Sequence, residues 1–202
     1  MDILKIESKI VAWSVSNTRP QDINSSEAPK RPSELSCKIY KVKIKGDDWT
    51  ICIGLLNNRP YEIFGGLSVY IDLPSKYKIG KIVKIDKKIS IYNLIVGENE
   101  DELIIKDIAN VFKNEINGAF TRILSLALRH GTPVKYIVEQ LQKDRFSDLT
   151  SFSKVIARVL KTYIKNGTKS NEKICSECNA ENSLVYQEGC IICNKCGWSK
   201  CG

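Results

Sequence analysis

The stretch CKIYKVKIKGDDWTICIGLL, residues 37–56, decides the fold class of this chain. Apolar and polar side chains alternate in its first nine residues, which is the period of a half-buried strand. Gly46-Asp47-Asp48 predicts a turn, and WTICIGLL continues with the same period. The stretch therefore predicts two neighbouring strands of an antiparallel sheet.

Further extended segments follow this pair. YEIFGGLSVYIDL, residues 61–73, comes after a predicted turn at residues 57–60, and we interpret its Gly65-Gly66 as a bend. Residues 81–86 and 89–96 predict a hairpin, and residues 101–106 a short strand. Cys37 and Cys52 stand alone in strand-like sequence and are interpreted as small buried apolar side chains.

From residue 107 onward the apolar residues recur every three or four positions, which is the period of an amphipathic helix. Residues 107–129 predict one long helix, or two that join near Asn117-Gly118. Thr132 and Pro133 predict the start of a second helix, and Ser151 caps a third over residues 152–164. A sheet followed by helices is typical of the α+β class, with the helices covering one face.

The C-terminal segment contains six of the eight cysteines. Cys175–Cys178 and Cys193–Cys196 have zinc-knuckle spacing, because a two-residue gap lets both sulfurs reach one ion. The intervening residues 179–192 are enough for the strand-turn-strand of a zinc ribbon. We therefore expect an α+β fold, an antiparallel sheet followed by about three helices, with a C-terminal zinc ribbon.

Two cysteines of this segment, Cys190 and Cys201, lie outside these pairs. Cys190-Ile-Ile-Cys193 is also a CxxC sequence, so a ligand set that uses Cys190 stays open. A near-terminal cysteine such as Cys201 is suited to thiol–disulfide exchange, in which reach and thiolate character govern the rate. The hypothesis is a zinc-organised tail that presents redox thiols. A Cys190–Cys201 disulfide would require the tail to fold back across the metal site.

Composition excludes several classes of function. With 202 residues, 43% hydrophobic and 27% charged, the chain is too short for a large cofactor-filled barrel and typical of a soluble globular protein. It has no secretory signal and no apolar run of the roughly 20 residues that span a bilayer, so we expect a cytoplasmic protein with no membrane partner. The single histidine, His130, stands at a predicted helix end, where a structural role is favoured.

The formal net charge of +8 raises the hypothesis of nucleic-acid binding, because basic surfaces attract phosphates. Residues 173–202, however, contain three basic and three acidic side chains, so the cysteine segment is neutral. The surplus lies mainly in lysines of residues 76–88, which alternate with aliphatic residues as on the solvent side of a strand pair. Nucleic acid is therefore the less favoured partner.

Several segments resemble the C-terminal region of adenosylcobalamin-dependent (class II) ribonucleotide reductases. The pattern CxEC, QEGC and CxxCGWSKCG is similar to the tail of that family. The resemblance continues from about Ala28 in the stretches KRPSELSCKIYKVKIKGDDWTICIGLLNNRPYEIFGG, GAFTRILSLALRHGTPVKYIVEQLQKD and FSKVIARVLKTYI. It implies the small domain that follows the catalytic barrel, and a zinc-ribbon end.

The barrel of that family would precede residue 28, so the resemblance implies that adenosylcobalamin acts only through a separate catalytic subunit of a ribonucleoside-diphosphate reductase. We assign no cofactor-binding residue here. In that family C-terminal cysteines reduce the active-site disulfide and are recharged by a thioredoxin- or glutaredoxin-like reductant. That role falls on Cys190 and Cys201 as redox shuttle thiols, with zinc held by Cys175, Cys178, Cys193 and Cys196. Any of the six cysteines could serve in either set.

These observations predict an N-terminal arm or linker at residues 1–35, an α+β domain at residues 36–166 and a zinc ribbon with a redox tail at residues 167–202. The expected function is that of a stand-alone C-terminal part of a class II ribonucleotide reductase, which re-reduces the active-site disulfide of the barrel. The first alternative is a zinc-ribbon module that binds nucleic acid or protein without redox chemistry. The second is an inactive remnant.

Overall fold

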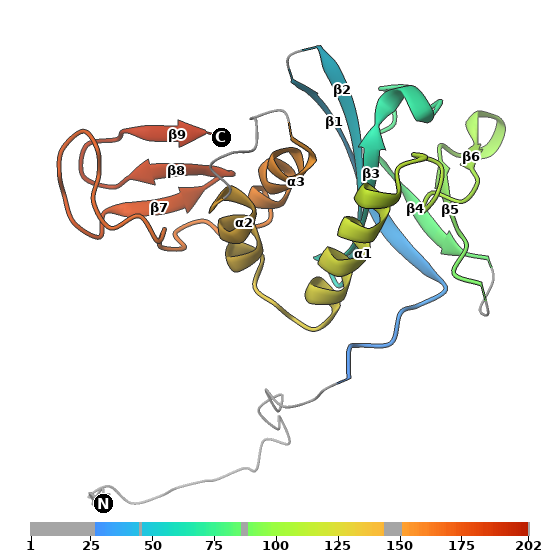
Figure 1. Cartoon of the computed structure of the whole chain (residues 1–202), viewed down its shortest axis with the longest axis horizontal. Helices are drawn as coiled ribbons and strands as arrows, with labels where there is room; N and C mark the ends of the chain where they lie inside the picture. Colours follow the sequence, from blue (N-terminus) through green and yellow to red (C-terminus); the bar gives the residue numbers. More distant parts are fainter. Residues whose placement is uncertain (1–26, 45, 86–88, 144–150, 202) are drawn as a thin grey trace, which may run out of the picture.

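The computed structural model describes residues 27–44, 46–85, 89–143 and 151–201 (Figure 1). Within them a six-stranded antiparallel sheet is followed by three α-helices and then by a three-stranded sheet that contains three of the six C-terminal cysteines. This confirms the predicted α+β class. Residues 1–26 of the predicted arm and residues 86–88 of the predicted hairpin lie outside the described residues.

The large sheet has the strand order β3-β2-β1-β4-β5-β6. The predicted neighbouring strands are β1 and β2, in which Ser36 lies opposite Leu55 and Ile44 lies opposite Asp47. Two 3-10 turns, η1 (Ser68–Tyr70) and η2 (Asn99–Asp101), interrupt the connections. The strands are β1 (Glu34–Ile44), β2 (Asp47–Leu56), β3 (Arg59–Leu67), β4 (Ile79–Lys84), β5 (Tyr92–Val96) and β6 (Leu103–Ile105).

The predicted bend at Gly65-Gly66 is wrong, because both glycines lie within β3 and pair with β2. Gly66 lies opposite Thr50, and a Cβ atom built there would come within 2.7 Å of the Phe112 side chain. A side chain at this position would therefore prevent the segment before α1 from packing on the sheet.

The three helices are α1 (Glu115–Arg129), α2 (Val134–Lys143) and α3 (Phe152–Lys161). The predicted helix over residues 107–129 is too long. Asp107 and Lys113 have positive φ angles of 48° and 49°, and the Asn114 side chain caps α1 by accepting the N–H of Asn117. His130 stands at the C-terminal cap of α1, as predicted. Within the described ranges, no helix has the length and apolar content needed to cross a membrane.

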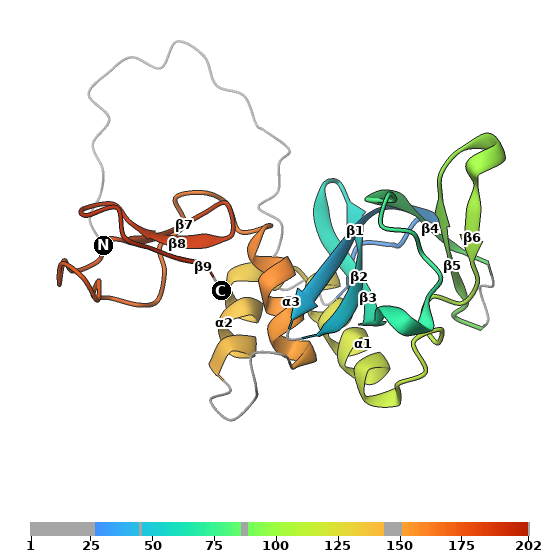
Figure 2. The ribbon, with the colours of Figure 1, turned by 90° about the horizontal axis from the view of Figure 1, so that it is seen from above.

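Two apolar cores lie on opposite faces of the large sheet. The first joins β2 and β3 to all three helices and to the C-terminal sheet, so that α2 and α3 lie between the two sheets (Figures 1 and 2). The second lies on the other face and includes Cys37, Cys52, Ile108 and Phe112. The burial expected for both cysteines is confirmed. Burial raises the pKa of Cys37, and its hydrogen bond with Cys52 raises that pKa further. Buried thiols of this kind are unreactive.

Helix α1 covers the outer edge of β3. The Ser125 hydroxyl accepts the N–H of Ile63 at 2.9 Å and donates to the carbonyl oxygen of Thr121 at 2.7 Å. A backbone group that would otherwise be free at the sheet margin is thereby bonded to the helix.

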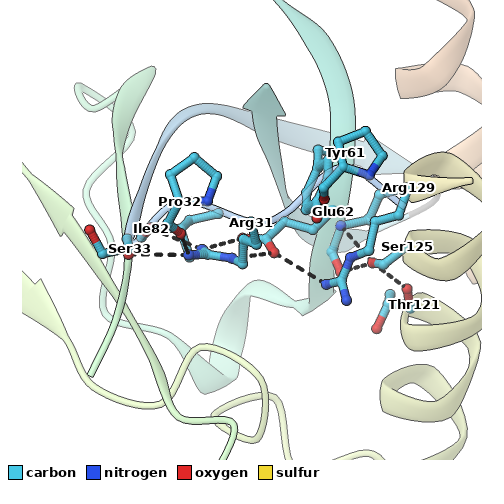
Figure 3. Close-up of polar contacts among 11 residues, drawn as sticks. Arg31, Pro32, Ser33, Tyr61, Glu62, Ile82, Thr121, Ser125 and Arg129 are labelled. Atoms are coloured by element: carbon cyan, nitrogen blue, oxygen red, sulfur yellow. Dashed lines mark hydrogen bonds and ion pairs between the residues drawn. The ribbon is translucent and has the colours of Figure 1, made fainter. Parts of the chain in front are cut away.

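The arm before β1 is fastened to the sheet by a buried carboxylate, Glu62 of β3 (Figure 3). Arg31 donates to both oxygens of Glu62, at 2.9 and 2.7 Å, and also to the carbonyl oxygen of Ile82 at 3.1 Å. Arg129 of α1 lies 3.3 Å from the same carboxylate. Tyr61 adds a further bond from its hydroxyl to the carbonyl oxygen of Pro29 at 2.7 Å. Glu62 and its two arginine partners therefore connect the arm, β3, β4 and α1.

Substituting Glu62→Gln should lower the free energy of unfolding by about 3–5 kcal/mol, because two partly buried guanidinium groups lose their counter-charge. Urea denaturation followed by circular dichroism measures this loss. Glu34→Gln is the matched control, since Glu34 forms an exposed ion pair with Lys81 and should cost at most about 1 kcal/mol. Equal costs for the two variants would contradict the structural role given to Glu62.

Candidate metal centre and cysteine pair

The C-terminal sheet consists of β7 (Leu184–Gln187), β8 (Cys190–Cys193) and β9 (Ser199–Cys201), in that order. Glu188 and Gly189, both with positive φ, form the two-residue turn between β7 and β8. The other edge of β7 is bonded by the segment after α3, since Tyr186 donates its N–H to Thr168 and accepts that of Gly167, both at 2.8 Å. The sheet is thereby held to the helical layer by backbone bonds.

The two CxxC segments fold into equivalent turns. In the first, Cys175 accepts the N–H of Asn179 at 3.0 Å and donates its own N–H to Ala180 at 3.1 Å. In the second, Cys193 accepts the N–H of Gly197 at 2.9 Å and donates its own to Trp198 at 2.7 Å. The residue after each CxxC, Asn179 or Gly197, has a positive φ, 55° and 78°. Asparagine and glycine tolerate this conformation best, which explains their presence there.

These turns bring four sulfur atoms together. The Sγ atoms of Cys175, Cys178, Cys193 and Cys196 all lie within 4.8 Å of one another. The distances Cys175–Cys196 and Cys178–Cys193 are both 3.7 Å. Four thiolates around zinc at about 2.3 Å would be separated by about 3.8 Å, so the cluster fits a tetrahedral zinc site. Cys175 and Cys193 are buried, whereas Cys178 and Cys196 are exposed.

The thiols of the cluster differ in their tendency to ionise. Cys193 Sγ lies 3.2 Å from the Ser183 hydroxyl, and this bond, aided by the N–H of Lys195, lowers the pKa of Cys193 to about 6. A backbone bond from Trp198 favours the Cys196 thiolate, but partial desolvation by the surrounding cluster and hydrogen bonds with the neighbouring thiols prevail and raise the pKa of Cys196 to about 12. Four thiolates at these distances would repel one another, and a divalent metal between them would supply the compensating charge.

Cys190 and Cys201 form a disulfide at the other end of β8. The two residues are direct cross-strand partners, and their Cα atoms are 4.4 Å apart, as in a non-hydrogen-bonded antiparallel pair. Cys201 is exposed, and Cys190 is half-buried. The disulfide is thus accessible from solvent mainly through Cys201.

The structure brings together the four cysteines that the sequence proposed as metal ligands, and it separates them from the other two. It does not support the alternative ligand set with Cys190. Cys190 and Cys193 are three residues apart in one strand, so their side chains point to opposite faces and their Cα atoms are about 10 Å apart. Cys201 belongs to β9. The tail does fold back, and the turn that reverses it is the second CxxC segment itself.

Two features were not predicted from the sequence: Ser183, which bonds to Cys193, and the buried pair Arg31–Glu62. The glutamate within the apolar stretch YEIFGG could have indicated a buried ion pair, since buried carboxylates need a cationic partner. The partner itself, 31 residues away, was not indicated by any local pattern. No sequence pattern indicated that Ser183 bonds to a cysteine, because serine is a common turn residue.

Residues 35–165 of the chain match the protein family described as NrdJ homologue C-terminal domain. No curated protein and no solved structure matches the chain. The family match extends from β1 to just beyond α3 and ends before the cysteine-rich sheet. It relates the chain to the class II ribonucleotide reductase NrdJ, as the resemblance implied. Because the match spans more than half of its residues, the chain belongs to the NrdJ homologue C-terminal domain family.

Proposed function

We propose that this chain is a zinc-organised thiol module of a ribonucleotide reductase, which carries reducing equivalents to the active-site disulfide of a separate catalytic subunit. The observation that carries the proposal is the division of the C-terminal cysteines into two sets. Four lie in a cluster that fits a metal, and two form a separate, partly exposed disulfide. The family membership supports a role associated with ribonucleotide reductase.

In the proposed exchange, a dithiol reductant reduces the Cys190–Cys201 disulfide to two thiols. A dithiol reductant of the thioredoxin or glutaredoxin class attacks Cys201 Sγ and breaks the Cys190–Cys201 bond, and the released Cys190 thiolate takes up a proton. The second thiol of the reductant then resolves the mixed disulfide. Two electrons and two protons reach this chain, and the reductant leaves as a disulfide.

Delivery to the catalytic subunit repeats these steps in the other direction. The Cys201 thiolate attacks the active-site disulfide, and Cys190 resolves the mixed disulfide by forming the Cys190–Cys201 bond again. The active site regains two thiols. The greater exposure of Cys201 supports its assignment as the attacking sulfur, and the half-buried position of Cys190 suits the resolving sulfur.

Zinc would be held by Cys175, Cys178, Cys193 and Cys196 and would supply structural stability, because it has no redox chemistry of its own. These residues hold the turn between β8 and β9, and the register of those strands brings Cys190 opposite Cys201. Ser183 orients one ligand. Adenosylcobalamin would act only on the catalytic subunit, in the cytoplasm, and no residue of this chain is assigned to it.

The native protein should contain one zinc per chain by elemental analysis. Ser183→Ala should weaken zinc binding by about ten- to a hundredfold in competition with a colorimetric chelator, because it removes the hydrogen bond to Cys193. Ser153→Ala, a serine on α3 outside the cluster, is the control and should leave the affinity unchanged. A zinc content that falls in Cys190→Ser rather than in Cys178→Ser would contradict the ligand assignment.

The wild-type chain should accept two electrons from thioredoxin, thioredoxin reductase and NADPH, and thiol titration should then show two additional reactive thiols. Cys201→Ser and Cys190→Ser should both lose this uptake, because neither retains the disulfide. Cys37→Ser is the control, since Cys37 is buried in the other core.

The functional readout is deoxyribonucleotide formation by a purified catalytic subunit supplied with thioredoxin. Adding the wild-type chain should raise turnover, and adding Cys201→Ser should not. Equal turnover with and without the wild-type chain would refute the proposed delivery of electrons, even if the disulfide itself proves reducible.

A further inference from the structure

Strand β1 is paired on both sides along only part of its length. Its first half pairs with β4 as far as Lys38 opposite Ile79, and Ile39 donates its N–H to Lys78 at 2.8 Å. The chain before Lys78 then turns away, since Tyr77 bonds back to Pro74. Along residues 40–44, β1 is therefore paired with β2 alone within the described part of the chain.

The backbone groups along this open edge can be assigned from the ladder. Odd-numbered residues of β1 direct their N–H and C=O groups toward the β4 side, as the bonds of Ile39 and of Ser33, the residue before β1, show. Lys41 and Lys43 have the same parity, so their backbone groups point to the open edge. A further extended segment could bond there, collinear with β4.

A groove lies where β1 and β4 separate. Its volume is about 370 Å³, and it is lined by Lys38, Ile39, Tyr40, Lys41, Lys78 and Ile79. Ile79 forms an apolar part of the wall and is 72% exposed, and Tyr40 is half-buried. The groove thus offers apolar surface beside unpaired backbone groups, which is what an added strand requires.

The rim of the groove is basic. Lys38, Lys41 and Lys78 line it, and Lys43 follows along the same edge; none of the four forms a salt bridge among the described residues. The Lys41 amine donates to the Thr50 hydroxyl at 2.8 Å. Burial lowers the pKa of Lys41, and Lys78 lowers it further, against the opposing influence of Cys52 and Asp48. An anionic partner would complement this edge.

We propose that the open edge of β1 binds an extended, acidic segment of a partner protein, which adds as a strand beside residues 40–44. A second copy of this chain is the poorer occupant, because edge-to-edge pairing would bring like-charged lysines together. The proposal does not depend on the cysteine chemistry, since the edge lies on the large sheet. It is therefore tested separately.

The probe is a blocked peptide of about six residues that alternates glutamate and valine, labelled for fluorescence anisotropy. It should bind the full chain with a Kd on the order of 0.1 mM or tighter at low salt, and binding should weaken as salt rises. Two control peptides should bind at least about fivefold more weakly. One alternates lysine with valine, and the other carries N-methyl groups that block its backbone bonds.

Variants of the chain locate the site. Lys41→Gln and Lys78→Gln should each weaken binding by roughly two- to fivefold, whereas Lys106→Gln, beyond β6 at the far edge of the sheet, should not. Lys43→Pro removes one N–H from the open edge and leaves the bonds to β2 intact, and it should weaken binding by about fivefold. Thermal denaturation checks that each variant is folded, and the N-methylated peptide tests the backbone bonds without any variant.

Amide hydrogen exchange in the free chain and in the chain with bound peptide tests the site directly. The Lys41 and Lys43 amides should exchange rapidly in the free chain and become protected with the acidic peptide. Protection of both amides before any peptide is added would show that the chain itself or a second copy already occupies the edge, and would overturn the proposal. Equal binding of the N-methylated peptide, tighter binding of a nucleic-acid oligomer to the same lysines, or no binding at about 1 mM peptide would also overturn it.

Discussion

The C-terminal sheet depends on the convergence of four sulfur atoms at one end of β8. Strands of three or four residues bury too little apolar surface to fold by themselves, and segments of this size usually need a metal or a disulfide. The cluster fixes the turn after Cys193, that turn fixes the register of β9, and the register brings Cys201 opposite Cys190. The proposed redox pair is therefore a geometric consequence of the proposed metal site.

The large sheet is fastened differently. Its arm, its third and fourth strands and its first helix meet at Glu62, where two guanidinium groups surround one carboxylate. Such a group contributes less to net stability than apolar packing of the same volume, but it accepts only one arrangement of its partners. The ion cluster thus fixes how the arm enters the sheet, while the two apolar cores supply most of the burial.

Local patterns in the sequence predicted the strands and turns whose formation depends on residues close together in the chain. Strand alternation located β1 and β2, and the CxxC spacing identified both turns of the sulfur cluster, because each depends on a few neighbouring residues. The start of α1 was misplaced, since Ile108 and Phe112 have helical spacing but pack on the sheet from non-helical turns. The bond from Arg31 to Glu62 could not be predicted, because it joins residues that only the folded sheet brings together.

The Cys190–Cys201 bond closes a covalent ring of chain, and two of the four clustered cysteines, Cys193 and Cys196, lie inside that ring. When the bond is intact, these two residues belong to a closed ring, because the disulfide holds Cys190 and Cys201 together. When it is reduced, they belong to an open stretch of chain. A metal that prefers the closed ring must, by thermodynamic linkage, favour the disulfide by the same free energy. The oxidation state of one sulfur pair and the metal affinity of the other sulfurs are then two measures of a single equilibrium.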